Sequence, residues 1–135
     1  MENKIKILLV DDDEINSFIL KKLIEKVEVR SSIETCINGQ EAFDYLKGIA
    51  HDAEKLPDIM LIDVNMPLMN GWELLAAFPL LGIEKVIDKY ILTSSSADAD
   101  LQKYKDLKAV LKGYIIKPIS RERLQEIMQP NQSWK

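Results

Sequence analysis

Two apolar segments of this chain end in acidic residues: the first in Asp11, Asp12 and Asp13, the second in Asp63. Clustered carboxylates repel one another and raise each other's pKa, and a hard divalent cation relieves that repulsion. Mg2+ prefers oxygen ligands in octahedral geometry, and it commonly takes one or two carboxylates together with a phosphate oxygen. If the four acids meet in the fold, they are therefore typical of a magnesium site.

Thr93 and Lys117 follow two further apolar segments, and they suggest what such a site would act on. Thr93 begins a run of hydroxyl side chains that reaches Ser96. Lys117 precedes Pro118, which lacks a backbone donor and allows a cis peptide bond. A lysine ammonium can neutralise anionic charge as a flexible point charge. Acids, a hydroxyl and an ammonium around Asp63 suit a phosphoryl group, which a carboxylate can accept as an aspartyl phosphate.

Several of these residues have a simpler explanation when each is taken alone. Asp13 precedes a predicted helix and is better explained as its N-cap, and Ser95 or Ser96 fits the same role for a later helix. A single lysine such as Lys117 is most often a solvated surface charge. The arrival of acids from two separate segments is what favours a site over these explanations.

The elements that must position these residues can be predicted from hydrophobic spacing. Short apolar or alternating segments predict strands at residues 5–10, 32–37, 59–62, 90–93 and 113–116. Apolar positions at helical spacing predict helices at 15–27, from the N-cap Asn38 to Ile49, at 72–78 before Pro79, at 97–108, and from the cap Ser120 to Met128. Glu41 is expected to reach back to Asn38 in a capping box. In the first helix the apolar positions are Ile15, Phe18, Ile19, Leu23, Ile24 and Val27.

The alternation of strands and helices predicts an α/β fold with a parallel sheet. The first, third and fourth strands are continuously apolar, so helices should cover both of their faces, whereas the alternating second strand should lie at an edge. Short right-handed crossovers favour a doubly wound (βα)5 sheet of order 2-1-3-4-5, a flavodoxin-like three-layer sandwich. Its crevice lies at the carboxyl ends of the first and third strands, where the acids would meet.

Size and composition limit the classes of protein to be considered. The chain has 135 residues, 47% of them hydrophobic, a net charge of −4 and one cysteine. These values predict one domain, over residues 1–129, with a tail at 130–135. An acidic chain without a basic patch does not favour nucleic acid, and no segment suits a membrane span or signal peptide. A single cysteine allows no internal disulfide and suits a reducing, cytoplasmic location.

Four motifs in register resemble the receiver domain of response regulators in two-component signalling, in particular the single-domain, chemotaxis-regulator-like kind. They lie at residues 8–12, at 61–67 together with Gly71, at 92–94 and at 113–118, and the resemblance covers residues 5 to about 129. It implies a signalling switch that phosphorylates and dephosphorylates only itself. It also implies a histidine kinase or histidine phosphotransfer protein as the phosphoryl donor and a downstream effector protein as the output partner, with no direct contact to nucleic acid or membrane.

The resemblance also implies a role for each site residue. Asp63 would be the phosphoacceptor and would also be one of the metal ligands. Asp12 would bind Mg2+ directly, Asp11 through water, and the backbone carbonyl of Asn65 would supply a further ligand, with Mn2+ as a substitute ion. No other cofactor is implied.

The remaining implied roles concern the response to phosphate. Thr93 and Lys117 would each bind a phosphoryl oxygen, and Tyr114 would swing inward as Thr93 shifts. The surface that reports this change would run from Ala97 to Met128, over the fourth helix, the fifth strand and the fifth helix.

Three alternatives remain open. An interaction-only pseudo-receiver would share the fold and lack phosphorylation, although such a protein would be expected to have lost one of the site residues. A small Mg2+-dependent phosphohydrolase would need an acid two residues after Asp63, where this chain has Asn65. A flavin-binding flavodoxin would need a phosphate loop after the first strand, where three aspartates would repel phosphate.

Overall fold

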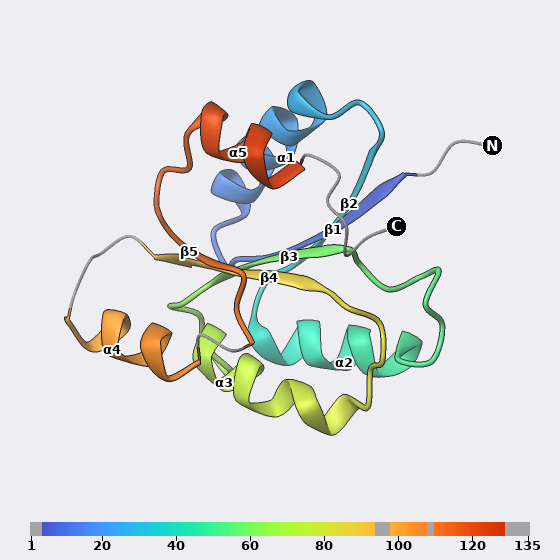
Figure 1. The fold of residues 1–135 in the computed structure, drawn as a ribbon, viewed down its shortest axis with the longest axis vertical. Helices are drawn as coiled ribbons and strands as arrows, with labels where there is room; N and C mark the ends of the chain where they lie inside the picture. Colours follow the sequence, from blue (N-terminus) through green and yellow to red (C-terminus); the bar gives the residue numbers. More distant parts are fainter. Residues whose placement is uncertain (1–3, 94–97, 108–109, 129–135) are drawn as a thin grey trace.

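A computed structural model describes residues 4–93, 98–107 and 110–128 of the chain. Its five-stranded sheet is parallel throughout and has the order β2-β1-β3-β4-β5, which confirms the predicted topology (Figure 1). The strands are β1 (Ile5–Val10), β2 (Ser31–Cys36), β3 (Ile59–Asp63), β4 (Asp88–Thr93) and β5 (Gly113–Ile116). Strand β4 begins two residues before the predicted start, and the other boundaries lie within one residue of the prediction.

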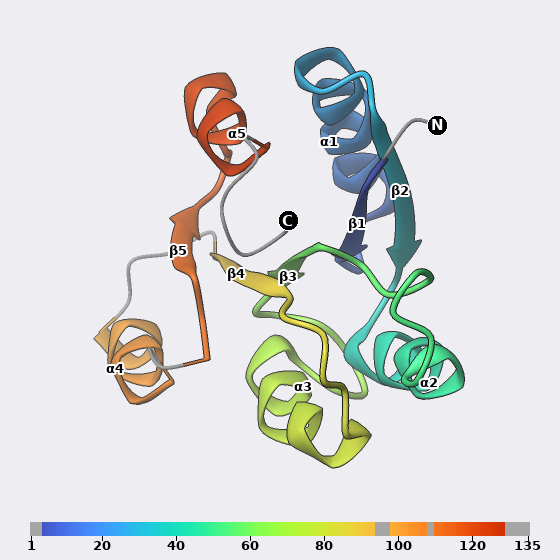
Figure 2. The same cartoon turned by 45° about the vertical axis from the view of Figure 1, so that its right-hand side comes forward.

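Helices cover both faces of the sheet and form the two outer layers (Figures 1 and 2). The first layer consists of α1 (Glu14–Val27) and α5 (Arg121–Met128), and the second of α2 (Gly39–Ile49), α3 (Gly71–Ala77) and α4 (Asp98–Asp106). Helix α3 was expected to end at Pro79. Instead the α-helix ends at Ala77, and a 3-10 turn, η1 (Phe78–Leu81), continues it with the proline in its first turn.

Alternate residues of the inner strands feed two separate hydrophobic clusters, one on each face of the sheet. In β1, Leu8 and Val10 face the cluster below α2 and α3, whereas Ile7 and Leu9 face the cluster below α1 and α5. Every residue of β3 is buried. The continuous apolar character of this strand therefore reflects burial on both faces, as predicted.

Side-chain caps fix the starts of the helices at the positions that follow the strands. The Asp13 carboxylate accepts the N–H of the third helical residue of α1 at 3.0 Å, which confirms the predicted N-cap. Asn38 caps α2, but the Glu41 carboxylate accepts the N–H of Ile37 rather than that of Asn38, so the predicted capping box is displaced by one residue. Asn70 caps α3 in a complete capping box that the sequence analysis did not identify.

Helix α1 packs on the sheet with only some of the apolar residues that its helical spacing identified. Three of its apolar residues are exposed, Ile15 by 75%, Phe18 by 61% and Ile19 by 59%. Leu20 and Ile24 are buried, and Leu23 and Val27 pack against the same cluster. The helix thus carries two adjacent apolar stripes, and the stripe through Leu20 and Ile24 faces the sheet.

Some predicted features lie outside the described residues. They are Ser94, Ser95, Ser96, Ala97, Lys108 and the tail at 130–135. In the part of the chain that the structure describes, no helix is both long enough and apolar enough to cross a membrane.

Candidate functional site

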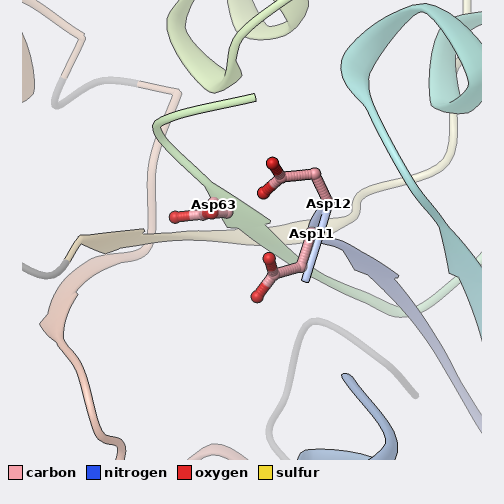
Figure 3. A group of neighbouring side chains, drawn as sticks. All are labelled: Asp11, Asp12 and Asp63. Carbon is pink, nitrogen blue, oxygen red and sulfur yellow. The ribbon is translucent and has the colours of Figure 1, made fainter. Parts of the chain in front are cut away.

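The acids at the ends of β1 and β3 meet at one point. Strands β1 and β3 are neighbours, with Val10 paired to Ile62, so the residues that follow these positions lie side by side. One carboxylate oxygen each from Asp11, Asp12 and Asp63 lies within 4.8 Å of the others (Figure 3). The structure thus brings together the three acids that sequence order alone places up to 52 positions apart.

The three carboxylates differ in burial. Asp11 is 4% exposed and Asp63 is 5% exposed, whereas Asp12 is an exposed residue. Two acids therefore form the floor of the cluster and one lies at its opening to solvent. The fourth acid, Asp13, caps α1, and its backbone N–H donates to the Asp11 Oδ1 atom at 2.9 Å.

Lys117 reaches the same cluster from the end of β5. Its Nζ atom lies 3.2 Å from Asp63 Oδ1 and 3.6 Å from Asp11 Oδ2. Its backbone N–H donates to the Thr93 carbonyl at 2.7 Å, and the Lys117–Pro118 peptide bond is cis. Lys117 is thus an ion-pair partner of the buried acids and not a solvated surface charge.

The pKa values of this pair follow from burial and from the neighbouring charges. Burial raises the pKa of Asp63 to about 6, and the Asp11 carboxylate adds to this rise, while the Lys117 ammonium opposes it. Burial by itself would lower the pKa of Lys117, but the Asp63 and Asp11 carboxylates outweigh that effect, and the pKa is raised. The ammonium therefore stays charged, and Asp63 loses its proton less readily than an ordinary aspartate does.

The charges and donor atoms of the cluster suit a hard divalent cation. Three carboxylates against one ammonium leave an excess of negative charge where two of the acids are buried. All three acids offer oxygen atoms, the donors that Mg2+ prefers, and exposed Asp12 leaves one side open for water and phosphate oxygens. The residues present therefore fit a magnesium ion.

The loop after β3 packs closely against the strand end that carries Asp63. The Gly71 N–H donates to the Val64 carbonyl at 3.0 Å. A side chain at Gly71 would bring its Cβ atom to 2.5 Å from the Asp63 carbonyl oxygen, which only glycine avoids. Asn65 is an exposed residue of this loop, two positions after Asp63, and its role as a carbonyl ligand stays a prediction.

The two predicted switch residues lie on neighbouring strands. Thr93 is the last residue of β4 and is fully buried. Tyr114 is half-buried in β5, and its ring packs on Tyr104 of α4 with 5.3 Å between ring centroids and 55° between planes. The contact joins β5 to α4, whereas the roles of Thr93 and Tyr114 in switching stay predictions.

Asn16 belongs to this site and was missed by the sequence analysis. Its side-chain Nδ2 donates to Asp11 Oδ2 at 2.8 Å. The signal for it was weak, since Asn16 is one of several polar residues in the first turn of the helix and lies three positions after the N-cap Asp13. Its contribution depends on the direction of the first turn of α1, which spacing alone does not give.

Comparisons with known proteins agree with this geometry. The family model for the response regulator receiver domain matches residues 7–129. The probable methanogenesis regulatory protein FilR2 of Methanothrix harundinacea is 29% identical over 129 residues, which are 95% of this chain and 81% of that protein. Several longer relatives also match, and the chain spans only 10% to 30% of their length.

Solved structures give the same result. The two component response regulator of Cytophaga hutchinsonii superposes with a TM-score of 0.79 at 29% identity, covering 93% of this chain and 95% of that one. The phosphorylated cyanobacterial phytochrome response regulator RcpA superposes with a TM-score of 0.74 at 28% identity, over 93% and 89%. Because the family match covers most of its length, the chain belongs to the response regulator receiver domain family, whose members act as signalling switches in two-component systems.

Proposed function

We propose that this receiver accepts a phosphoryl group on Asp63. The observation that carries the proposal is the 3.2 Å contact between the Asp63 carboxylate and the Lys117 ammonium inside the acidic cluster. Asp11 lies in the same cluster, but its two oxygens already accept hydrogen bonds from Asp13 and Asn16. Asp63 is therefore the buried acid that suits a nucleophile, and Asp11 suits a fixed ligand.

The reaction follows the general logic of phosphoryl transfer, in which positioning and charge neutralisation dominate. An oxygen of Asp63 attacks the phosphorus of a phosphorylated histidine in a kinase or phosphotransfer protein. A phosphorus–oxygen bond forms as the phosphorus–nitrogen bond breaks, and the imidazole keeps the electron pair and takes up a proton. The Lys117 ammonium and the Thr93 hydroxyl each bind a phosphoryl oxygen.

The carboxylates of Asp11, Asp12 and Asp63 and the Asn65 carbonyl would hold the magnesium ion, or Mn2+ in its place. When bound, this cation supplies positive charge that stabilises the transferring phosphoryl oxygens. Within the protein, the Lys117 ammonium favours the ionised form of Asp63, whereas burial and the Asp11 carboxylate disfavour it. Because burial raises the pKa of Asp63 to about 6, transfer should slow below that pH as the carboxylate takes up a proton.

The phosphorylated state adds close to two negative charges and new acceptor oxygens beside Thr93 and Lys117. The hydroxyl and the ammonium move toward these oxygens, and Tyr114 follows. Because the Tyr114 ring packs on Tyr104, such a movement changes the surface made by α4, β5 and α5. This surface is the proposed binding site for a downstream effector protein in the cytoplasm.

The proposal is tested by measuring the intact mass of the protein after incubation with acetyl phosphate and Mg2+. We expect one phosphoryl adduct on the wild type, none with EDTA, and none on Asp63→Asn. Asp13→Asn is the matched control, because asparagine also caps helices well and the substitution removes an acid of the same run. A folded wild type that gains no adduct, and that does not bind beryllofluoride with Mg2+, would support the interaction-only alternative.

A further inference from the structure

Asn16 connects the first turn of α1 to the acidic cluster. Its backbone N–H donates to the Asp13 carboxylate at 3.0 Å, so its position is set by the cap of the helix. Its side-chain amide then donates to Asp11 Oδ2 at 2.8 Å. An amide held at both its backbone and its side chain is a rigid donor to a carboxylate that is 4% exposed.

Asn16 and Asp13 together determine the orientation of the Asp11 carboxylate. The Asp13 N–H donates to Oδ1 at 2.9 Å, and the Asn16 amide donates to Oδ2. With one neutral donor on each oxygen, the carboxylate plane is fixed without removing its negative charge. Loss of such a hydrogen-bond partner behind a metal ligand typically weakens metal affinity or activity by roughly 10- to 100-fold.

Asn16 also affects which of the two buried carboxylates, Asp11 or Asp63, the Lys117 ammonium lies closer to. Asp11 Oδ2 accepts the amide at 2.8 Å, whereas the ammonium lies 3.6 Å from the same oxygen. The ammonium is closer to Asp63, at 3.2 Å. Because Asp11 Oδ2 already accepts the amide, it has less need of the ammonium, and Lys117 lies closer to the acid that is proposed to accept phosphate.

We propose that Asn16 is a positioning residue for the divalent cation site, which it serves by holding the Asp11 carboxylate in the orientation needed to bind the ion. This inference rests on the proposed function, because it assumes that the cluster of Asp11, Asp12 and Asp63 binds Mg2+. It adds a residue from α1 to a site otherwise built from strand ends. It assigns no chemical step to Asn16 itself.

The test is the Mg2+ dissociation constant of the full chain, measured by calorimetric titration for the wild type and two variants. Asn16→Leu keeps the approximate volume of the side chain and removes its donor. Gln40→Leu is the matched control, because the Gln40 amide donates to Asp44 at 3.1 Å on an exposed face of α2. We expect Asn16→Leu to bind Mg2+ about tenfold more weakly, and Gln40→Leu to bind it as the wild type does.

A second readout separates positioning from general stability. The Mg2+ concentration for half-maximal phosphorylation by acetyl phosphate should rise in Asn16→Leu by the same factor as the dissociation constant, and excess Mg2+ should restore the rate. A merely structural role would lower the melting temperature and leave both quantities unchanged. Unchanged Mg2+ affinity in folded Asn16→Leu, or an equal loss in Gln40→Leu, would overturn the inference.

If Asn16→Leu does not fold, the wild-type chain still tests the inference. The side-chain amide signals of Asn16 in a 15N correlation spectrum should shift on titration with Mg2+, with the dissociation constant that calorimetry gives. Signals that do not move while the protein binds Mg2+ would overturn it. A wild type that binds no Mg2+ contradicts the proposed metal site itself, so the two failures have different signatures.

Discussion

Asp63 and Asp11 are both buried aspartates at the ends of neighbouring strands, yet their surroundings give them different chemistry. Asp11 accepts two hydrogen bonds from neutral donors, whereas the Asp63 carboxylate pairs with Lys117. Burial raises the pKa of Asp63 to about 6, above the ordinary value of 3.8. The protein therefore keeps Asp63 ionised at neutral pH only at the cost of folding stability.

This cost predicts how the stability of the metal-free protein depends on pH. A buried acid whose pKa is raised on folding binds its proton more tightly in the native state, so stability falls as pH rises from about 4 to about 6. The asparagine side chain in Asp63→Asn cannot ionise, so the variant does not show this fall in stability with rising pH. In EDTA at neutral pH, the variant should unfold with a free energy higher than that of the wild type by roughly 1–2 kcal/mol.

Urea unfolding of both proteins at several pH values measures this difference. The difference in unfolding free energy between Asp63→Asn and the wild type should narrow toward zero only as the pH falls below 3.8, where Asp63 becomes protonated in the unfolded state as well as in the native state. A gap that stays constant with pH would contradict the raised pKa of Asp63.

The sequence predicted the acids of the site, but it did not predict that the Asn16 side-chain amide donates to Asp11. Asp11, Asp12 and Asp63 could be found because residues that follow parallel strands meet at one edge of the sheet. Asn16 could not, because its donor reaches Asp11 only through the direction of the first turn of α1. Spacing determines the face on which a residue lies, but not which atom it approaches.

Among the elements, the path of the loop between β3 and α3 is determined by the close approach of Gly71 to the backbone carbonyl of Asp63. Gly71 lies against the carbonyl of Asp63, and it begins α3 directly after the cap Asn70. The start of α3 is thus fixed to the strand end that carries the proposed phosphoacceptor. A change at this glycine should disturb stability and site together.

Gly71→Ala should destabilise the fold by about 1–3 kcal/mol, because its Cβ atom would lie 2.5 Å from a backbone oxygen that cannot move aside. Gly48→Ala is the matched control. A Cβ atom at position 48 would have no neighbour within 4 Å, and alanine favours the helix interior by about 0.5–1 kcal/mol. Thermal unfolding followed by circular dichroism measures both, and equal melting temperatures for the two variants would refute the close-approach argument.

Helix α1 shows the limit of hydrophobic spacing as a guide to burial. Its apolar residues form two stripes, and either stripe satisfies a helical period. Which stripe faces the sheet depends on how α1 packs against β2 and α5, and that information is not in the helix itself. The structure buries Leu20 and Ile24 and exposes Ile15, Phe18 and Ile19.

Truncation of one residue from each stripe tests this orientation. Ile24→Ala should cost about 2–5 kcal/mol, since Ile24 is fully buried. Phe18→Ala should change the unfolding free energy by less than about 0.5 kcal/mol, because the Phe18 side chain is 61% exposed and its ring lies beside the exposed Lys22 ammonium. Similar losses in the two variants, measured by urea unfolding, would mean that α1 packs with both stripes.

For the whole molecule, the order of the strands was predictable from the sequence, but the long-range contacts of the loop at residues 50–58 were not. Continuous and alternating apolar segments determined which strands are central, and the topology followed from short connections. The loop at residues 50–58 is held by Lys85, whose Nζ lies 2.9 Å from the Leu56 carbonyl and 3.0 Å from the Asp58 carboxylate. These partners lie about 30 positions away, and no local pattern indicates them.

The acidic cluster links the stability of the whole fold to metal binding. A ligand that binds only the native state raises stability by about 2.7 kcal/mol at a concentration about 100 times its dissociation constant. Mg2+ should therefore raise the melting temperature of the wild type relative to EDTA. Asp12→Asn should reduce this increase, because Asp12 is the exposed acid at the opening of the cluster. A melting temperature that is the same in Mg2+ and in EDTA would argue against a metal site.

The measurement that tests the central proposal most directly is the position of the phosphoryl group. After phosphorylation by acetyl phosphate with Mg2+, borohydride reduces an aspartyl phosphate to homoserine, which peptide mass spectrometry can locate in the chain. We expect homoserine at position 63, with Asp11, Asp12 and Asp13 unmodified. Homoserine at any of these three positions, with Asp63 intact, would contradict it.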